Sequence, residues 1–376
     1  MHKHYTHSGC LLIAGAVILL LSSQVPFNSD KDSTRAMTNS ALQRELRILN
    51  SEFPYNLDPH TANYSSEAQV LTGLFEGLFS YDPYTLEALP AIAESYKVSR
   101  DKKTWTFTLK SNAKFSNDEA ITAQSVYDSW MKLLSPITQA PFASLLDCIE
   151  GVENYRTGKR TKEAVGIRVT GPHTLVVKLL NPTEHFPKIL CHHAFSVVHN
   201  DSSVYSGAFT LSSQTATEIV LQKNNSYWDS SNVALPSICF ILSDDLEENT
   251  FLYNTGSFDW ACDAVNSGKI IDKNDVLVST QFGTEYLFFK SQRAPWNSEK
   301  ARNALLYAIP WDELRSLSIV PADTLLVQLN GYPEVAGLGD QDLEEGKRLL
   351  EEAQIPLNQR IITCAVPDNS YIIRQM

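Results

Sequence analysis

The stretch LPAIAESYKVSRDKKTWTFTLKSNAKFSNDEAITAQSVYDSW, residues 89–130, decides the fold of this chain. Near its centre, Trp105, Phe107 and Leu109 alternate with threonines. Apolar residues at every second position, with β-branched residues between them, are typical of a half-buried strand. The pattern therefore predicts a strand over 104–109.

A helix follows this strand. Thr122 is a residue type that favours the N-cap position. After it, Val126, Trp130 and Leu133 fall on one helix face. Pro136 is expected to end the helix, because proline interrupts helical hydrogen bonding.

The chain before this stretch predicts one more strand and one more helix. The strand is the apolar run LRIL at 46–49. Ser66 to Gln69 fits a capping box, in which the serine accepts from a backbone amide and the glutamine reaches back. The apolar residues behind it share one helix face: Leu71, Leu74, Phe75 and Leu78.

The rest of the chain passes irregularly between short strands and helices. Further strands are predicted at 174–180, 218–222, 238–242, 258–265 and 361–366, and helices at 244–253, 299–309 and 343–353. A barrel or a dinucleotide-binding fold would show regular strand–helix alternation. The order therefore predicts an α/β protein with several lobes.

Length and charge narrow the class of protein. At about 150 residues per domain, a chain of 376 residues predicts two to three domains. The formal net charge is −12, so the chain has no overall field that attracts nucleic acid. Nucleic acid is not an expected partner.

The N-terminus has the three parts of a secretory signal. Lys3 precedes an apolar run from Cys10 to Leu21, and small polar residues follow the run. A helix of this length rises about 18 Å, short of the roughly 30 Å hydrocarbon core of a bilayer. We expect a cleaved signal peptide over 1–23, a flexible leader over 24–41, and an exported protein of the periplasm or cell envelope. A retained membrane anchor is the alternative.

The five cysteines after the signal are widely spaced and form no C-x-x-C motif, which argues against redox motifs and zinc ribbons. Buried free thiols are expected, with a Cys239–Cys262 disulfide as the alternative. Cys191-His192-His193 is the densest group of metal-ligand residue types. Because neighbours on a strand point to opposite faces, we expect structural histidines there. The sequence predicts no metal and no cofactor.

Motifs of hydrolases and phosphate-binding enzymes are missing, among them H-E-x-x-H, G-x-S-x-G and the phosphate loop. The acid pairs Asp244-Asp245 and Glu247-Glu248 stand at a predicted helix start. Carboxylates there oppose the helix dipole favourably, so a solvated helix end explains them. The residues give no reason to predict an enzyme.

Six motifs follow one another along the chain. They are LDPH at 57–60, LFEGL at 74–78, the block 94–130, APFA at 140–143, NNSYW at 224–228 and APWN at 294–297. Together they resemble the extracytoplasmic solute-binding proteins of peptide ABC importers, the oligopeptide- and dipeptide-binding family. The block 94–130 is the strongest match, and the likeness runs from about residue 45 to the end.

The resemblance implies a periplasmic-binding-protein-like α/β fold with two lobes around a ligand cleft plus an extra domain. Residues 42–79 and 185–283 would form the first lobe, 80–184 the extra domain, and 284–376 an incomplete second lobe. The sequence is expected to stop where the family continues. The family's further part includes a segment with Trp and Asp whose carboxylate pairs with the α-ammonium group of the peptide.

The resemblance also implies ligand-binding residues. In chain order they are Asn63, Tyr64, Ser65, Phe142, Gly207, Thr284, Glu285 and Tyr286. Ser65 serves equally well as a helix N-cap, Phe142 as a core residue and Gly207 as a turn glycine. Residues 284–286 are expected on the strand that enters the second lobe, where their backbone would pair with the ligand.

The function implied by the resemblance is that of the substrate-binding subunit of an ABC-type oligopeptide importer. Such a protein captures peptides by their backbone without a cofactor. It then acts as a monomer and delivers them to the transmembrane subunits of a permease. Two alternatives stay open. One is an exported peptide hydrolase, and the other is a truncated, transport-inactive surface or scaffold protein.

Overall fold

The structure is a computed structural model that describes residues 45–52, 54–262, 264–277, 284, 286–316, 322–326, 333, 337 and 339–364. The chain divides into two compact units, Met1–Thr280 and Gln281–Met376. The signal peptide and the leader predicted over 1–41 lie outside the described residues, so both stay predictions.

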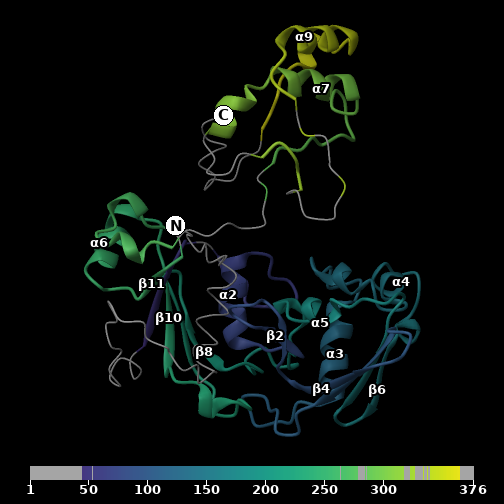
Figure 1. The fold of residues 1–376 in the computed structure, drawn as a ribbon, viewed down its shortest axis with the longest axis vertical. Coiled ribbons are helices and arrows are strands. Elements are labelled where there is room, and N and C mark those ends of the chain that lie inside the picture. Colours follow the sequence, from purple (N-terminus) through teal and green to yellow (C-terminus); the bar gives the residue numbers. More distant parts are fainter. Residues whose placement is uncertain are drawn as a thin grey trace, which may run out of the picture. The chain divides into compact units, whose positions relative to one another are not determined.

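A five-stranded sheet forms one part of the first unit (Figure 1). Its strands lie in the order β11 (Trp260–Ala261), β1 (Leu46–Asn50), β10 (Ser237–Leu242), β9 (Glu218–Lys223) and β8 (Phe209–Gln214). β1 runs parallel to β10 and β11, whereas β9 is antiparallel to both of its neighbours. Helix α2 (Ser65–Leu74) packs beside β8, and α6 (Leu246–Asn254) follows β10.

A four-stranded antiparallel sheet forms the other part of this unit. Its strands lie in the order β4 (Ala93–Val98), β5 (Thr104–Leu109), β7 (Thr174–Lys178) and β6 (Ile167–Gly171). Helix α3 (Ala123–Leu133) packs against β6 and β7 (Figure 1). The hairpin β2 (Phe79–Tyr81) and β3 (Ala88–Pro90), helices α4 (Val152–Arg156) and α5 (Phe186–Ile189), and the 3₁₀ turns η2 (Ala143–Leu146) and η4 (His193–Phe195) complete it.

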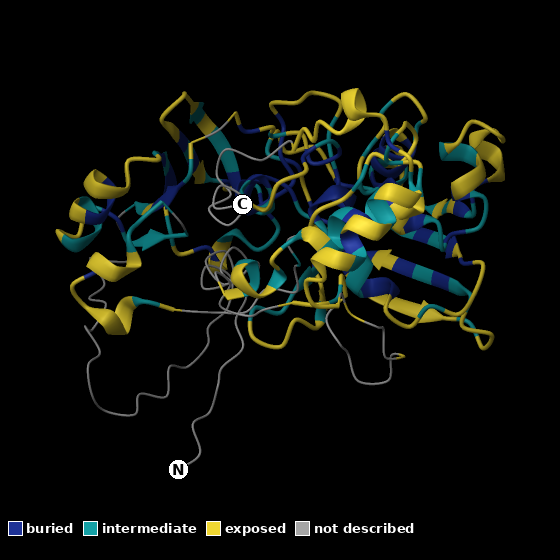
Figure 2. Ribbon diagram, turned by 90° about the horizontal axis from the view of Figure 1, so that it is seen from above, coloured by how far each residue is buried: buried dark blue, intermediate teal, exposed yellow. Residues whose placement is uncertain are grey.

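Each sheet has its own hydrophobic core, drawn in dark blue in Figure 2. In the first core, Ile48 of β1 stands in register with Phe240 of β10, and both side chains are buried. In the second core Trp130 of α3 is fully buried, and its indole N–H donates to the Phe195 carbonyl over 3.0 Å. Its buried polar atom therefore has a partner, as a buried tryptophan requires.

The second unit contains helices α7 (Glu299–Ala308), α8 (Trp311–Ser316) and α9 (Leu343–Glu352). α7 and α9 pack closely, because Gly346 has no side chain to hold them apart: a Cβ there would stand 3.1 Å from the Ala304 carbonyl oxygen. Lys300 and Glu352 join the same two helices over 2.7 Å. Among the residues that the structure describes, every helix is too short or too polar to span a bilayer.

The predicted α/β class is confirmed, and so are several elements. The strand over 104–109 has its predicted bounds, and Thr122 caps α3 by accepting from the Ser125 amide. The capping box predicted at Ser66–Gln69 is formed by other residues. Tyr64 is the N-cap of α2, and Glu67, rather than Gln69, reaches back to the backbone. The domain boundaries predicted at 79/80, 184/185 and 283/284 stay predictions.

Two predicted strands are wrong in extent. Among the described residues of 258–265, only Trp260–Ala261 form a strand, because β11 lies at the sheet edge and pairs with β1 through two residues. Residues 361–364 form no regular structure, and Ile361 is 77% exposed. A strand needs a paired neighbour, and within the described ranges no strand lies beside these four residues. The last two predicted residues, 365 and 366, lie outside the description.

Candidate functional site

The loop before α2 is shaped by one buried carboxylate. Glu67 is 2% exposed and lies in the first turn of the helix. Its Oε2 accepts from the backbone N–H groups of Asn63 and Tyr64 over 2.8 and 2.9 Å, and its Oε1 accepts from that of Asn56 over 2.8 Å. These three bonds tie the loop to the helix start. The amides of Asn63 and Tyr64 are therefore engaged within the protein.

The predicted residues of this loop are accessible. Asn63, Tyr64 and Ser65 are all exposed, and the Tyr64 side chain is 61% exposed. Ser65 is the first residue of α2 and not its cap, so the alternative of an N-cap at Ser65 is wrong. The loop therefore offers the Tyr64 ring and the polar groups beside it to a ligand, on a backbone that is already fixed.

Phe142 joins this loop through two histidines. Its ring centroid lies 4.3 Å from that of His192 and 5.7 Å from that of His193. The two imidazoles lie 4.3 Å apart at 32°. The Ala62 carbonyl, next to Asn63, acts on the His193 ring and opposes the lowering of its pKa, and η4 packs against α2. The structure thus brings Phe142 and the loop together, although one follows the four-stranded sheet's helix and the other precedes α2.

The histidine pair lies in a turn, so the expectation that these neighbours lie on a strand is wrong. Residues 193–195 form η4 and not a strand, so neighbouring side chains are not sent to opposite faces. His192 accepts from the Ala194 amide, and both rings pack on Phe142. Within the described residues, no group of three or more His, Cys, Asp or Glu side chains is arranged to hold a metal ion.

Burial controls the protonation of this cluster. Burial lowers the pKa of His192 to about 3, with a further contribution from His193. Burial also lowers the pKa of His193, against the opposing effects of the Ala62 carbonyl and of Glu67. His60, in the same loop, is fully buried, and burial lowers its pKa to about 4. At neutral pH all three rings are therefore uncharged.

Gly207 lies at the other end of α2. Its N–H donates to the Leu74 carbonyl over 2.9 Å, and a Cβ on it would stand 2.6 Å from the Gly73 carbonyl oxygen. Because α2 has ten residues, its two ends are about 15 Å apart. The structure therefore does not place Gly207 beside Asn63, Tyr64 and Ser65. Glycine there allows close approach of two backbones.

We expect Gly207→Ala to lower the free energy of unfolding by about 1–3 kcal/mol, because the new methyl group meets backbone atoms that cannot rotate aside. Urea unfolding followed by circular dichroism measures this. Gly171→Ala is the matched control, since a Cβ there would meet only the Thr174 side chain, at 3.6 Å. Equal losses in the two variants would contradict this role for Gly207.

The remaining predicted residues belong to the second unit. Thr284 is half-buried and Tyr286 is exposed, and neither Thr284 nor 286–290 forms a strand. The strand predicted to enter the second lobe is therefore absent from these described positions. Glu285 lies outside the described residues. The Tyr286 and Phe288 rings lie 6.2 Å apart.

Sequence reasoning missed Glu67, His60 and His193 as parts of this site. Glu67 had a readable signal, because a glutamate three residues after an N-cap is the reaching partner of a capping box. His60 and His193 had none, because their roles depend on burial and on a contact between distant segments. Cys239 and Cys262 are both thiols, so the disulfide between them is not formed.

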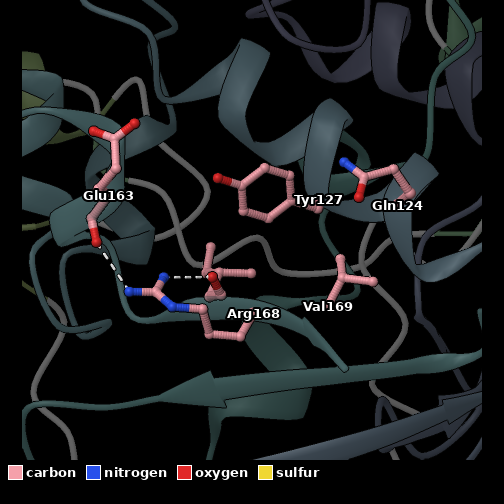
Figure 3. A pocket seen from close by; sticks show the side chains of 6 residues that line it. Gln124, Tyr127, Glu163, Arg168 and Val169 are labelled. Carbon is pink, nitrogen blue, oxygen red and sulfur yellow. Dashed lines mark hydrogen bonds between the residues drawn. The ribbon is translucent and has the colours of Figure 1, made fainter. Parts of the chain in front are cut away.

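A groove between α3 and β6 is separate from these residues (Figure 3). It is lined by Gln124, Tyr127, Glu163, Ile167, Arg168 and Val169. The Arg168 guanidinium donates to the carbonyls of Ile167 and Glu163 over 2.7 and 2.9 Å, while the Glu163 carboxylate points away from it. Arg168 thus bonds to the first residue of the edge strand β6 and to the turn that precedes it.

Comparison with known proteins gives a family match over most of the chain. Residues 87–372 match the model described as bacterial extracellular solute-binding proteins, family 5 middle. The chain is 27% identical over 321 residues to the dipeptide-binding protein DppE of Bacillus subtilis, covering 81% of this chain and 59% of DppE. It is 28% identical over 375 residues to the periplasmic oligopeptide-binding protein OppA of Salmonella typhimurium, covering 91% of this chain and 68% of OppA. The chain thus spans about three fifths to two thirds of their length.

Solved structures share the fold. The Escherichia coli murein tripeptide binding protein MppA aligns with a TM-score of 0.74 at 26% identity, covering 84% of this chain and 68% of MppA. OppA of Burkholderia pseudomallei aligns with a TM-score of 0.73 at 23% identity, covering 83% of this chain and 67% of OppA, and supports the fold alone. Because the family match extends over about three quarters of its residues, the chain belongs to the bacterial extracellular solute-binding proteins of family 5.

Proposed function

We propose that this chain is the substrate-binding subunit of an ABC-type oligopeptide importer, exported to the periplasm or cell envelope. It captures peptides by their backbone and delivers them, as a monomer, to the transmembrane subunits of a permease. The observation that carries the proposal is the family match over 87–372. Relatives named for oligopeptide, dipeptide and murein peptide binding support peptide as the ligand class.

Binding by the backbone follows from the task of accepting many peptides. All peptides share amides and carbonyls, which can pair with protein groups as an added strand does. Water fills the space around varied side chains and adapts its hydrogen bonds to each. In this proposal Tyr64 and Phe142 contact the ligand, while Glu67 holds the loop that carries Tyr64 and His193 packs on Phe142. Gly207, Thr284, Glu285 and Tyr286 remain proposed ligand contacts that await a bound peptide.

The proposal is tested by mixing the purified chain with a pool of short peptides and following thermal unfolding and mass spectra of the pool. A ligand at 100 times its Kd should stabilise the chain by about 2.7 kcal/mol, with every peptide recovered intact. Cleaved peptides would establish the hydrolase alternative. No stabilisation by any peptide would favour the transport-inactive alternative. A relative is named as a probable deoxycholate-binding protein, so stabilisation by deoxycholate alone would replace peptide as the ligand.

Tyr64→Ala is expected to weaken peptide binding about tenfold, because an exposed aromatic ring on a fixed loop contributes large contact area at low entropic cost. Isothermal titration calorimetry with the tightest peptide measures the change. Tyr84→Ala is the matched control: Tyr84 is 65% exposed against 61% for Tyr64, but lies in the turn between β2 and β3. Equal weakening by both substitutions would remove Tyr64 from the site.

A further inference from the structure

Glu76 stands where the chain passes from one sheet of the first unit to the other. It lies two residues after α2 and shortly before β2. Its backbone N–H donates to Ser206 Oγ over 3.1 Å, and its carbonyl accepts from the Val197 amide over 2.8 Å. Ser206 Oγ in turn donates to the Val197 carbonyl over 2.6 Å. The segment that leaves α2 toward the four-stranded sheet and the segment 197–206 that leads back to β8 are therefore hydrogen-bonded to each other at Glu76.

The Glu76 side chain is held by two neighbours in the turn between β9 and β10. The Tyr227 hydroxyl lies 2.5 Å from Oε1, and the Trp228 indole N–H donates to Oε2 over 2.6 Å. Tyr227 is 7% exposed. Each carboxylate oxygen thus has its own partner, and both partners lie in the connection between two strands of the five-stranded sheet.

The four-stranded sheet reaches the same cluster through Lys110. Its Nζ lies 4.1 Å from the centroid of the Trp228 ring and also donates to the Ala91 carbonyl and, over 2.9 Å, to the Ala93 carbonyl. A cation over an indole face is attracted by the ring's charge distribution. Trp228 is therefore bound by Glu76 on its N–H edge and by Lys110 on its ring face.

The two partners of Glu76 respond differently to a proton. An indole N–H can only donate, so Oε2 must stay an acceptor. A tyrosine hydroxyl can donate or accept, so a proton on Oε1 reverses the bond to Tyr227 without breaking it. We propose that Glu76, held by Tyr227 and Trp228, is a proton-operated latch between the two sheets of the first unit, and that the folded chain is more stable when this carboxyl group is protonated. The proposal does not depend on peptide binding.

The charges around the latch agree with this. Burial raises the pKa of Glu76 to about 7, against the opposing effects of the bonds from Tyr227 and Trp228 and of Lys110, while Asp229 raises it further. Burial lowers the pKa of Lys110, against Glu76, Glu94 and Asp229. Burial and Glu76 raise the pKa of Tyr227, so its hydroxyl stays protonated. The nearby cation does not outweigh the desolvation of the carboxylate.

The sign of the pH effect follows from linkage. A free glutamate side chain has a pKa of 4.5, below the value of about 7 in the folded chain. Between these two values the folded chain binds the extra proton and the unfolded chain does not. The stabilisation from Glu76 is therefore complete below pH 4.5 and is lost as the pH rises through 7.

The test compares urea unfolding of the full chain and of Glu76→Gln near pH 5 and near pH 8. Glutamine keeps a carbonyl for Trp228 and a donor for Tyr227, and it does not titrate. The quantity to compare is the ratio of two unfolding constants, that of the natural chain over that of Glu76→Gln. This ratio should rise on the order of a hundredfold from pH 5 to pH 8. Glu52→Gln, a change at an exposed carboxylate of the same unit, should leave the constant's pH dependence unaltered.

Tyr227→Phe gives a second measurement should the glutamine variant fail to fold. Loss of the hydroxyl removes a bond that favours the charged carboxylate, so the pH at which stability is lost should move upward. A ratio for Glu76→Gln that stays constant from pH 5 to pH 8 overturns the proposal. An unmoved midpoint in Tyr227→Phe overturns it as well.

Discussion

Glu67→Ala is expected to lower the free energy of unfolding by about 3 kcal/mol and to weaken peptide binding by at least about tenfold. The substitution leaves the amides of Asn56, Asn63 and Tyr64 without their acceptor. Bonds to a charged group contribute about 1.5–3 kcal/mol each, and water will replace part of them because Asn63 and Tyr64 are exposed. The loop then pays the cost of ordering when a ligand binds.

Two further variants make this prediction sharp. Glu67→Gln keeps one oxygen for Asn63 and Tyr64 but turns an NH₂ group toward the Asn56 amide, so an intermediate loss is expected. Ser66→Ala is the control from the same helix turn, because Ser66 is neither the cap nor its reciprocal partner. Urea unfolding and titration calorimetry measure both effects. If Ser66→Ala cost as much as Glu67→Ala, the capping scheme in the structure would be wrong.

Local patterns were enough to predict much of the fold. The alternation around Trp105 and Phe107 predicted β5, because one face of that strand is buried and the other is not. Thr122 predicted the start of α3, because a cap is a contact between neighbours in sequence. β4 gave no such signal. It is an edge strand exposed from residue 94 to residue 98, and only its pairing with β5 makes it a strand.

Part of the candidate site was likewise predictable from the sequence, and part was not. Asn63, Tyr64 and Phe142 were predicted by resemblance, and in the structure Phe142 packs on His193, whose pKa the Ala62 carbonyl raises. No spacing in the sequence predicts this arrangement, because Ala62, Phe142 and His193 are far apart along the chain. Gly207 has a packing role that its place in the sequence does not reveal, because a Cβ there would meet the backbone at the end of α2. Its contact with a ligand stays a prediction.

His60→Phe is expected to make the chain more stable than the natural one in mild acid. His60 is fully buried, and within the described ranges neither ring nitrogen has a hydrogen-bond partner. A phenylalanine ring of similar shape therefore leaves no bond unmade, and stability near pH 7 should change by less than about 1.5 kcal/mol. The difference between the two chains appears only where the imidazole takes up a proton.

The sign and size of that difference follow from the pKa values. Burial lowers the pKa of His60 from 6.5 to about 4, with Asp58 opposing and Lys132 assisting. Between these values the unfolded chain binds a proton that the folded chain does not, so the stabilisation present above pH 6.5 is lost as the pH falls toward 4. Near pH 5 the natural chain should have lost about 2 kcal/mol that His60→Phe keeps.

This loss must be measured as a difference between chains, because a second site works against it. Glu76 adds stability as the pH falls from 7 toward 4.5, over nearly the same interval in which His60 removes it. His192 and His193, whose pKa values burial also lowers, remove stability over the same interval in every one of these chains. The contribution of Glu76 is therefore measured by urea unfolding as the difference between His60→Phe and the double variant with Glu76→Gln, and this difference should grow on acidification. A His60→Phe profile parallel to that of the natural chain between pH 7 and pH 5 would show that His60 does not titrate as its burial requires.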